Sequence, residues 1–378
     1  MNRDNLAKIF ANYIDNFDFL NGEENQEYFK WQLAKQFRPM MDNALLAPDD
    51  EFLQALKEIK RMTRGLIDIG GQSSPFEGLC KFAEHDPSEV RSMFEDLLAS
   101  GYYTPQERTG RILRFLDRGT ALKNRYHKDG HIYKQDFRSA TCYMFLYDPD
   151  NNFLYKPSHV DTIAKYIEFY EDLGSGNAVN LEKFDAMCNG MLDAINTDEK
   201  LLATNARRYQ QGFIVSPDTL HPDTNKHILL ADIIYCCGSS DYRLLDGIAY
   251  RPLTSIQKKE HLSRLAKAKD CKQRREQAMQ QEAELREAEE FIVETYTAGT
   301  VIHHKSLGDG VIKQMQGTQA IIAFGASEKL LDLKGLIGYG LIECSRPNYR
   351  DILKDSGEIG IRSQNIQKEY EQYADLLD

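Results

Sequence analysis

The sequence has no long hydrophobic segment, no disulfide pattern and no signal peptide. It lacks any run of about 18 apolar residues, which excludes a membrane-spanning helix, and its first residues lack the basic and then apolar order of a secretory leader. The 7 cysteines are scattered, odd in number and without a CxxC pair, which indicates reduced and mostly buried thiols. These absences predict a cytoplasmic protein with no membrane partner.

The sequence also lacks recognisable catalytic motifs. No G-x-x-x-x-G-K-[ST] loop is present, and Gly325–Lys329 is too short to be one and predicts a turn. Gly174–Gly176 lacks the spacer residues of a G-x-S-x-G nucleophile elbow. We therefore expect a non-enzymatic protein with no catalytic residue and no cofactor.

Histidines that could bind a metal have simpler explanations. His127 and His131 flank a predicted turn at Lys128–Gly130, which does not establish the helical spacing of metal ligands. His303 and His304 should point to opposite faces of a strand. The best cluster comprises Asp218, His221, Asp223 and His227. It lies in a proline-containing segment typical of a solvated loop, so we predict no metal site, and a hydrolase with a metal there is the third functional alternative.

Basic residues are outnumbered in the first part of the chain but locally concentrated. Residues 1–250 hold 28 Lys and Arg against 38 Asp and Glu, which disfavours general binding to nucleic acid. Arg111, Arg114 and Arg118 nevertheless recur on one face of a predicted helix. Such a stripe could contact a phosphate backbone, or it could be a solvated face that pairs with the domain's acids. The candidate nucleic-acid-binding residues are Arg108, Arg111, Arg114, Arg118, Arg125 and Lys128.

Apolar periodicity predicts that residues 1–250 are mainly helical. One stripe covers Leu6–Ile14 and another covers Phe52–Met62. Asp86 can cap a helix that begins at Pro87. The apolar segment Ile228–Tyr235 fits either a buried helix or a strand.

Several short motifs in this helical region follow the order found in a known family. They are Tyr28–Gln32, Pro87–Leu97, Arg111 with Phe115, Gln135 with Tyr155 and Lys156, and His227–Tyr235. Their arrangement resembles the helical domain upstream of the ATPase in McrB-like restriction proteins. The resemblance implies recognition of DNA or of a partner protein, with nucleotide hydrolysis left to a separate motor that has no counterpart here.

A charge-segregated helix is predicted from Ser255 to Tyr296. Its first part, Ile256–Arg275, carries 8 Lys and Arg against 2 acidic residues, and its second part, Glu276–Glu294, carries 7 Glu against 1 Arg. This order opposes the helix dipole. Three interpretations stay open: a solvated spacer helix, antiparallel pairing of two copies as a coiled-coil homodimer through residues 255–296, and phosphate binding by the basic part.

A small β-rich module is predicted near the C-terminus. Two apolar runs flank a segment in which Gly308 and Gly310 permit a sharp turn. The candidate protein-docking residues are His304, Leu307, Gly308, Gly310, Phe324 and Lys329. The alternative is that the glycines only close a structural hairpin.

The glycines of this module belong to a wider pattern. The pattern comprises Gly299, Ile302, His304, Leu307, Gly308, Gly310 and Ile312. It resembles the Tudor/SH3-like domain at the C-terminus of UvrD/PcrA-type DNA helicases, with Leu307 in place of the family's Phe. The resemblance implies a docking module without catalytic residues, which in the helicases contacts RNA polymerase.

Together these features predict a mainly α fold with a small C-terminal β domain. We expect a helical recognition domain at 1–250, a charged helix at 251–296, an SH3-like or Tudor-like barrel at 297–345, and a tail at 346–378 with a terminal helix around 363–377. The predicted function is an adaptor in DNA metabolism or restriction-like antiviral defence, which bridges DNA or an ATPase or nuclease partner to a protein docked on the barrel. The runner-up is a purely protein-binding scaffold that self-associates through the charged helix.

Overall fold

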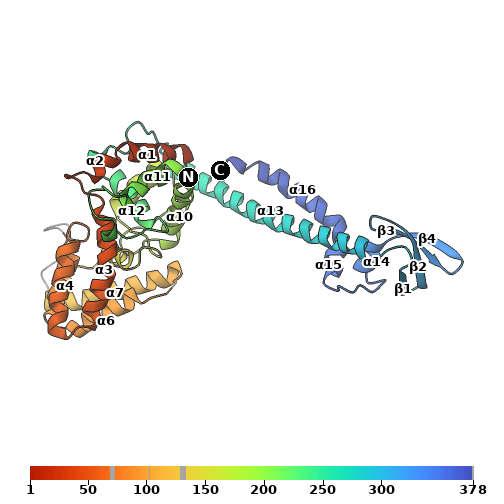
Figure 1. Cartoon of the computed structure of the whole chain (residues 1–378), viewed down its shortest axis with the longest axis horizontal. Coiled ribbons are helices and arrows are strands. Elements are labelled where there is room, and N and C mark those ends of the chain that lie inside the picture. The colour runs from red at the N-terminus through yellow and green to blue at the C-terminus, as the bar shows by residue number, and fades with distance from the viewer. Residues whose placement is uncertain (69–72, 102, 128–132, 377–378) are drawn as a thin grey trace. The chain divides into compact units, whose positions relative to one another are not determined.

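The chain folds into helices and one small sheet. The computed structural model describes all residues except 69–72, 102, 128–132 and 377–378. It confirms a mainly α fold with a small C-terminal antiparallel sheet, and the chain forms two compact units, Met1–Pro252 and Leu253–Asp378 (Figure 1). Within the described part of the chain, no helix is both long enough and apolar enough to cross a membrane.

The first unit, called the helical unit below, is built around one continuous apolar core. Its elements are α1 (Arg3–Asp15), α2 (Phe17–Asn21), α3 (Phe29–Leu46), α4 (Asp49–Thr63), α5 (Pro75–Ala83), α6 (Pro87–Leu98), α7 (Pro105–Tyr126), α8 (Phe137–Tyr147), α9 (Pro157–Tyr166), α10 (Leu181–Thr197), α11 (Glu199–Ala206), η2 (Arg207–Tyr209), η3 (Pro217–Thr219), α12 (His227–Cys237) and η4 (Ser240–Tyr242). The core draws on both predicted stripes, because Leu6 and Phe52 are fully buried.

Local capping determines where the two helices nearest the candidate site begin. The Asp86 side chain accepts a hydrogen bond from the backbone N–H of Glu89 at the start of α6, which confirms the predicted cap. Thr104 and Glu107 form a reciprocal capping box at the start of α7. Both helices carry proline in their first turn, where the missing N–H costs nothing.

The apolar segment that periodicity left open is helix α12. Nearly all of its residues are buried, so it has no polar face. A helix surrounded by other elements shows no amphipathic period, and this is why the sequence pattern alone did not separate helix from strand.

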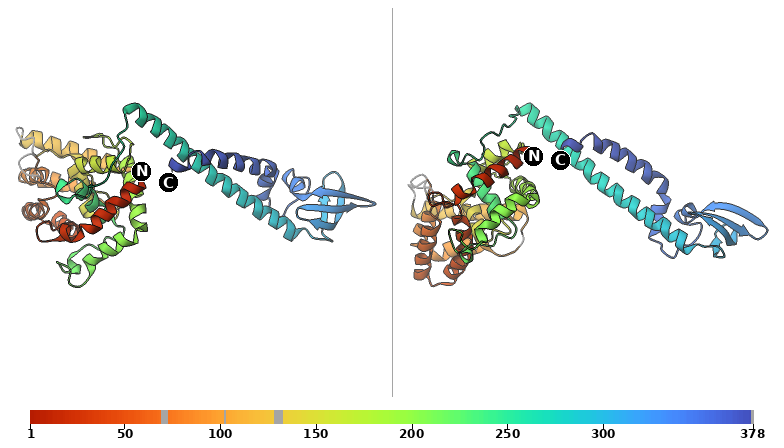
Figure 2. Two further views of the ribbon diagram at one scale, coloured as in Figure 1. Left: turned by 90° about the horizontal axis from the view of Figure 1, so that it is seen from above. Right: turned by 45° about the horizontal axis from the view of Figure 1, so that its top comes forward.

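The second unit, called the C-terminal unit below, combines a long helix with the sheet. Its elements are α13 (Ser255–Thr295), β1 (Val301–His304), β2 (Gly308–Gln316), β3 (Gln319–Phe324), β4 (Ser327–Asp332), α14 (Leu333–Gly338), α15 (Tyr349–Lys354), α16 (Ser356–Glu371) and η5 (Ala374–Leu376). The strands are all antiparallel in the order β1-β2-β3-β4. Figure 2 shows α16 folding back along α13.

The long charged helix is therefore packed against its own chain. Cys271 and Ala278 of α13 form a small apolar cluster with Ile366 of α16, and Arg274 makes an ion pair with Glu369 at 2.9 Å. At its other end, Ala288 and Ile292 of α13 belong to the core under the sheet. A four-stranded sheet has too little apolar surface to form a core alone, which explains why α13 contributes to it. Pairing of α13 with a second copy stays a prediction.

Candidate binding cleft in the helical unit

The predicted arginine stripe lies on α7, where two of its members are bonded to acids of α6. Arg114 donates two hydrogen bonds to Asp96, from Nε to Oδ2 at 3.0 Å and from Nη2 to Oδ1 at 2.9 Å. Arg118 donates from Nε to Glu89 Oε1 at 2.7 Å. These hydrogen bonds lower the pKa of Asp96 and the pKa of Glu89. The two arginines thus tie α7 to α6.

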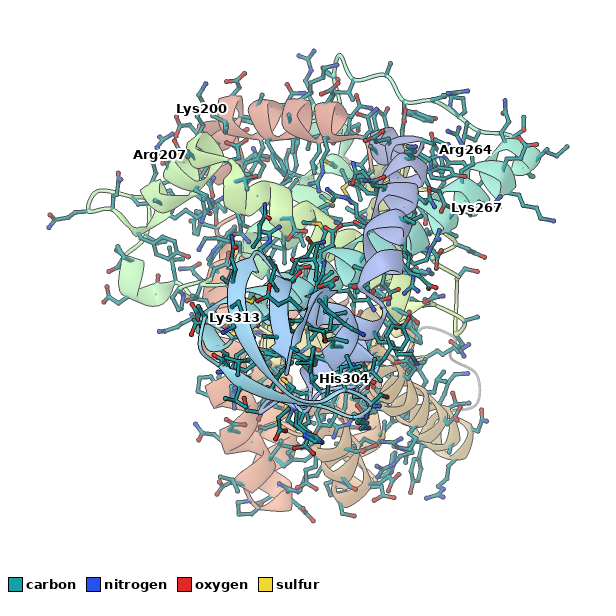
Figure 3. All side chains as sticks on the ribbon, turned by 90° about the vertical axis from the view of Figure 1, so that its right-hand side faces the viewer. Lys200, Arg207, Arg264, Lys267, His304 and Lys313 are labelled. Carbon is teal, nitrogen blue, oxygen red and sulfur yellow. The ribbon has the colours of Figure 1, made fainter. Side chains whose placement is uncertain are left out.

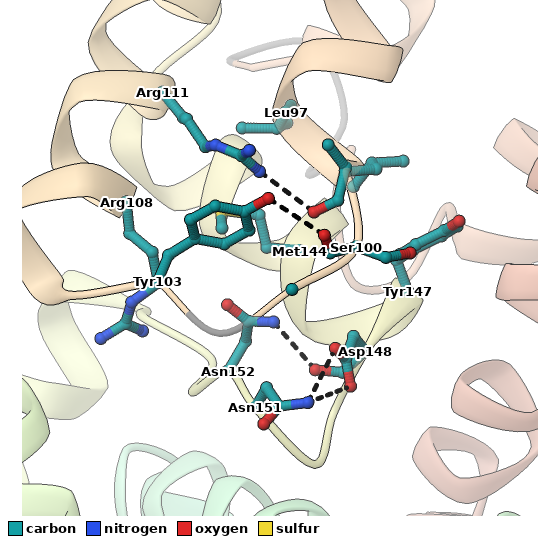
Figure 4. A pocket seen from close by; sticks show the side chains of 13 residues that line it. Leu97, Ser100, Tyr103, Arg108, Arg111, Met144, Tyr147, Asp148, Asn151 and Asn152 are labelled. Atoms are coloured by element: carbon teal, nitrogen blue, oxygen red, sulfur yellow. Dashed lines mark hydrogen bonds between the residues drawn. The ribbon is translucent and has the colours of Figure 1, made fainter.

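The arginines nearer the start of α7 are also engaged. Arg108 forms an ion pair with Asp185 of α10, and its side chain is only 11% exposed. Arg111 lies over the Tyr103 ring, with its Cζ atom 3.5 Å from the ring centroid, and donates to the Ala99 carbonyl at 3.0 Å (Figure 4). Such stacking holds a guanidinium in place without neutralising its charge.

The remaining predicted residues lie at the far end of α7. Arg125 is 63% exposed and its Nη1 lies 3.6 Å from Asp86 Oδ2. Lys128 lies outside the described residues. Four of the six candidate residues, Arg108, Arg114, Arg118 and Arg125, therefore each have a carboxylate partner. This pairing favours the alternative in which the arginines form ion pairs with acidic residues of the same domain.

A cleft of about 370 Å³ opens beside the start of α7. Its lining residues are Tyr103, Pro105, Arg108, Asp150, Asn151, Phe153, Glu182, Asp185, Ala186, Asn189 and His227. They come from the segment before α7, from α7 and α10, from the segment after α8 and from the first residue of α12. Tyr103, Arg108 and Asn151 also line the neighbouring pocket drawn in Figure 4.

The segment after α8 forms one wall of the cleft and is held by its own hydrogen bonds. Asn151 donates from Nδ2 to Asp148 Oδ2 at 2.9 Å, and Asn152 donates from Nδ2 to the Asp148 carbonyl at 2.9 Å (Figure 4). These bonds hold the turn that follows α8. They fix the wall and place Asp150 at the cleft.

The cleft is acidic, and it borders polar atoms that lack partners. Its lining includes three acids, Asp150, Glu182 and Asp185, and one arginine, Arg108. Asp150 Oδ1, Asp185 Oδ1 and Arg108 Nε are buried and have no hydrogen-bond partner. Burial raises the pKa of Asp185 against the opposing effect of Arg108. The lining thus carries more negative than positive charge.

The cluster that could have bound a metal comprises Asp218, His221, Asp223 and His227, and its side chains make separate structural contacts. Asp223 caps α12 by accepting from the backbone N–H groups of Ile228 and Leu229, each at 2.9 Å. His221 accepts from the Asp223 N–H. Asp218 accepts a hydrogen bond from Ser216, and His227 stacks on Phe153 at the cleft. The sequence predicts a solvated loop here, but Asp223 is buried. It is buried because its carboxylate binds the N–H groups at the start of α12.

The six predicted docking residues divide between the interior and the surface of the C-terminal unit. His304 is 7% exposed, and its Nδ1 accepts from the Ser306 and Leu307 N–H groups. His303, in contrast, is exposed and bonds Asp309, which confirms that the two histidines point to opposite faces. Gly310 has no room for a side chain, because an added Cβ would lie 2.6 Å from Phe324 Cε1.

Three docking residues remain accessible or shape the turn. Gly308, the first residue of β2, has a φ of +74°, the left-handed conformation that favours glycine. Leu307 is 37% exposed, and Lys329 is exposed on the edge strand β4. The geometry of the hairpin thus explains Gly308 and Gly310, in line with the alternative that these glycines only close a structural hairpin.

The outer face of the sheet was not singled out from the sequence. Val301 lies directly opposite Val311, and Val311 opposite Ala323. Leu330 lies opposite Ile321 on the next pair of strands. Val301 and Leu330 are 66% and 65% exposed, although the solvent face of an antiparallel sheet is ordinarily polar. The signal available in the sequence was the unbroken Ile321–Ile322 and Leu330–Leu331 pairs, which leave one apolar residue on each face.

A buried ionic network in the helical unit was also missed. Lys30 donates from Nζ to Asp232 Oδ1 at 2.6 Å and is ion-paired with Glu27. Arg208 donates from Nη2 to the Tyr13 hydroxyl at 2.8 Å, and Tyr13 donates to Asp232. All five residues are at most 2% exposed. A charged residue in an apolar run, as Asp232 is, was the signal for such a pairing.

The network resembles a metal site in composition but already contains its cation. Glu27, Asp232 and Cys236 bring three potential ligand atoms within 4.8 Å of one another. The Lys30 ammonium lies between the two carboxylates. Burial by itself lowers the pKa of Lys30, but Asp232 and Glu27 outweigh burial and raise it. We assign the network a structural role.

Lys156 differs from the other buried lysine and arginine residues because it takes part in none of the described ion pairs. It is 9% exposed, and its Nζ lies 4.3 Å from the centroid of the Tyr235 ring, which also has Lys30 Nζ at 4.1 Å. Burial lowers the pKa of Lys156 to about 8, with Lys30 and Arg138 adding to this effect and Cys142 opposing it. Burial, followed by Lys156 and Lys30, lowers the pKa of His159 to about 4.

Comparison with known proteins gives no relative: no family model, no curated protein and no solved structure matches this chain. The two family resemblances therefore stay predictions. The residues that carry the first of them are largely interior, because Trp31, Gln135 and Asp232 are fully buried.

Proposed function

We propose that this chain is a non-catalytic recognition and adaptor protein that joins two protein partners. The helical unit would hold one partner at the acidic cleft, and the C-terminal unit would dock the other on the outer face of its sheet. The proposal also includes a setting in DNA metabolism or restriction-type defence and a cytoplasmic location. Only features of the sequence support these two parts.

One observation carries the preference for protein over nucleic acid. Four of the five α7 arginines, all except Arg111, have a carboxylate partner, in Asp185, Asp96, Glu89 and Asp86. Binding to nucleic acid depends on cations that are free to replace counterions. The cleft that Arg108 lines is acidic, which repels phosphate.

The salt dependence of DNA binding tests this preference. Full-length protein would be titrated with labelled single- and double-stranded DNA from 25 to 300 mM salt (roughly the range in which phosphate contacts are lost), beside the triple variant R111A, R114A and R118A. We expect no saturable binding by either protein. Binding that falls steeply with salt and disappears in the triple variant would reverse the proposal in favour of nucleic acid.

Exposed apolar side chains support docking on the sheet. Val301, Val311 and Leu330 lie on its outer face, and large exposed apolar residues that gather on one face mark protein contacts. A photo-crosslinking residue at Val311 or Leu330 should therefore capture a defined partner, which is then tested with purified components, RNA polymerase first. The matched control is Val293, which is 45% exposed on α13. Equal crosslinking from Val293 would contradict a docking face.

Nucleic-acid contact is the second candidate, and exposed cations favour it. Arg114 and Arg125 are 56% and 63% exposed despite their ion pairs. Arg264 and Lys267 are also exposed on the basic part of α13, as Figure 3 shows. The DNA titration separates these sites, since loss of binding in the α7 triple variant would assign the contact to the helical unit and its retention to α13.

A further inference from the structure

The sheet of the C-terminal unit has one covered edge and one open edge. Beside β1, Lys305 donates its backbone N–H to the Leu341 carbonyl at 2.9 Å, and His304 forms an isolated bridge with Ile342. At the other end of the order β1-β2-β3-β4, nearly all residues of β4 are exposed. Within the described part of the chain, no strand pairs with the outer side of β4. An open edge of this kind is a template for a further strand.

The register between β3 and β4 shows which backbone groups lie along the open edge. Leu333 donates its N–H to the Thr318 carbonyl at 2.9 Å, one position beyond the last pair of the ladder, Gln319 with Asp332. A bond placed in this way means that the last pair is itself of the non-hydrogen-bonded type, and the two types alternate along an antiparallel ladder. Three residues of β4 therefore direct their backbone N–H and C=O groups away from β3: Glu328, Leu330 and Asp332.

The side chains of the same three residues lie on the outer face of the sheet. Leu330 pairs with Ile321 and Glu328 pairs with Ala323, whereas the fully buried Ile322 lies between them on the inner face. Leu330 is 65% exposed, and the acids two positions away on each side of it are also exposed. A strand added at this edge would therefore face an acid, an apolar residue and a second acid in turn.

The charges of β4 argue against a second copy of the strand as the occupant. Antiparallel pairing of two β4 strands centred on Leu330 would place Glu328 of each copy opposite Asp332 of the other. The register centred on Lys329 would place that lysine opposite itself. Like charges directly opposite each other destabilise a strand pair, whereas opposite charges stabilise it. The edge is thus complementary to a strand with basic residues at the two outer positions.

We propose that β4 pairs with an extended segment of a partner protein that has an apolar residue flanked, two positions away on each side, by lysine or arginine. The apolar residue lies opposite Leu330 and beside the apolar surface of Ile321 and Val311. The basic residues pair with Glu328 and Asp332, and the backbone hydrogen bonds of Leu330 provide affinity for any extended chain. The inference rests on the proposed function, because it specifies how the sheet would dock its partner.

Calorimetric titration of the full-length protein with synthetic peptides tests the pairing. The probe is acetyl-Thr-Val-Lys-Thr-Val-Thr-Lys-Val-Thr-amide, in which two Lys flank the central Val at the required spacing. One counterpart has Glu in place of both Lys, and another is methylated on the backbone nitrogen of the central Val. We expect saturable binding of the probe and slower hydrogen exchange of the Leu330 amide. Each counterpart should bind at least about tenfold more weakly, because the first loses both charge pairs and the second loses a backbone donor.

A charge reversal tests the assignment to β4. Glu328→Lys should weaken binding of the probe and strengthen binding of the peptide that contains Glu. Glu287→Lys, the same change at an exposed position of α13, should leave both affinities unchanged and serves as the matched control. Circular dichroism establishes that both variants are folded.

Several outcomes would overturn the inference. They are the absence of saturable probe binding at millimolar concentration, equal binding of the methylated peptide, and equal binding by Glu328→Lys. A dimer of the free protein that dissociates in Leu330→Asp, as measured by sedimentation, would assign the edge to a second copy instead. Crosslinking of a partner through Val311 would still support docking on the outer face after any of the first three outcomes, so failure of the inference is distinguishable from failure of the proposed function.

Discussion

The helical unit and the C-terminal unit differ in where their charged and apolar side chains lie. In the helical unit Lys30, Arg208 and Asp232 are fully buried, and most α7 arginines are bonded to acids. In the C-terminal unit the charges of α13 are mostly exposed, while Val301 and Leu330 present apolar surface to solvent. A large core can enclose paired charges, whereas a small one leaves apolar residues outside.

The difference underlies the proposal for how each unit would recognise a partner. The helical unit uses its cations for internal bonds, so its spare binding capacity is the negative charge of the cleft. The C-terminal unit has little core to stabilise, and its outer sheet face remains available for contact. Charge would thus decide recognition in one unit, and apolar area would decide it in the other.

The largest effect is expected when the buried network is broken. Asp232→Ala leaves Lys30 and Arg208 buried without their shared acid, which should lower the free energy of unfolding of the helical unit by about 3–5 kcal/mol. Urea unfolding followed by the fluorescence of Trp31, the only tryptophan, reports this unit. Asp246→Ala, which removes an exposed pair with Arg243, should change it by less than about 0.5 kcal/mol. Similar losses in both variants would remove the contrast between buried and exposed charge.

A change at Gly310 should affect the C-terminal unit alone. Gly310→Ala forces a methyl group against Phe324 and Ile322, at a cost of about 1–3 kcal/mol. Hydrogen exchange of the amides in residues 301–324 should accelerate, with no shift in the Trp31 unfolding midpoint. Gly335→Ala, where an added Cβ meets nothing within 4 Å, is the control and should leave exchange nearly unchanged. Unaltered exchange in Gly310→Ala would mean that the sheet tolerates the extra volume.

Removal of the unpaired buried lysine should stabilise the helical unit. Because burial lowers the pKa of Lys156 from 10.5 to about 8, its charged form is disfavoured in the folded state. The wild-type protein should therefore gain stability as the pH rises from about 8 to 10.5. Lys156→Met should stabilise the unit by about 1–2 kcal/mol at pH 7, with the gain gone above pH 10.5. Lys165→Met, an exposed change on α9, is the control, and destabilisation by Lys156→Met would show that its cation–π contact with Tyr235 dominates.

The smallest effect is expected at the exposed ion pairs of α13. Arg274 is 41% exposed and bonds both Asp270 and Glu369, so Arg274→Ala should cost less than about 1 kcal/mol and less still at high salt. Hydrogen exchange in α16 measures this cost, with Lys272→Ala as the control. A loss comparable with that of Asp232→Ala would mean that surface charge holds the two helices together.

Much of the fold could be predicted from local patterns. The cap at Asp86, the apolar stripes of α1 and α4 and the exposed and buried histidines of β1 all follow from residues a few positions apart. The type of α12 could not, because burial on every side removes the period that marks a helix.

The candidate site was only partly predictable. The arginines of α7 were found by their spacing, but Arg108 meets an acid 77 positions away and Arg118 one 29 positions away. The same spacing serves a phosphate-binding face and an internally paired face, so the pattern alone left both open. The acidic cleft was missed because its members come from separate helices and two connecting segments.

The sequence by itself determined the mainly helical character, the position of the small sheet and the start of α6 at Asp86, because these depend on side chains within one or two turns of each other. Only the tertiary structure decided which charges are paired, as with Lys30 and Asp232 at a separation of 202 positions, and which acids are left facing a cleft. Pairing and burial depend on distances across the fold, and it is packing of the whole core that sets them.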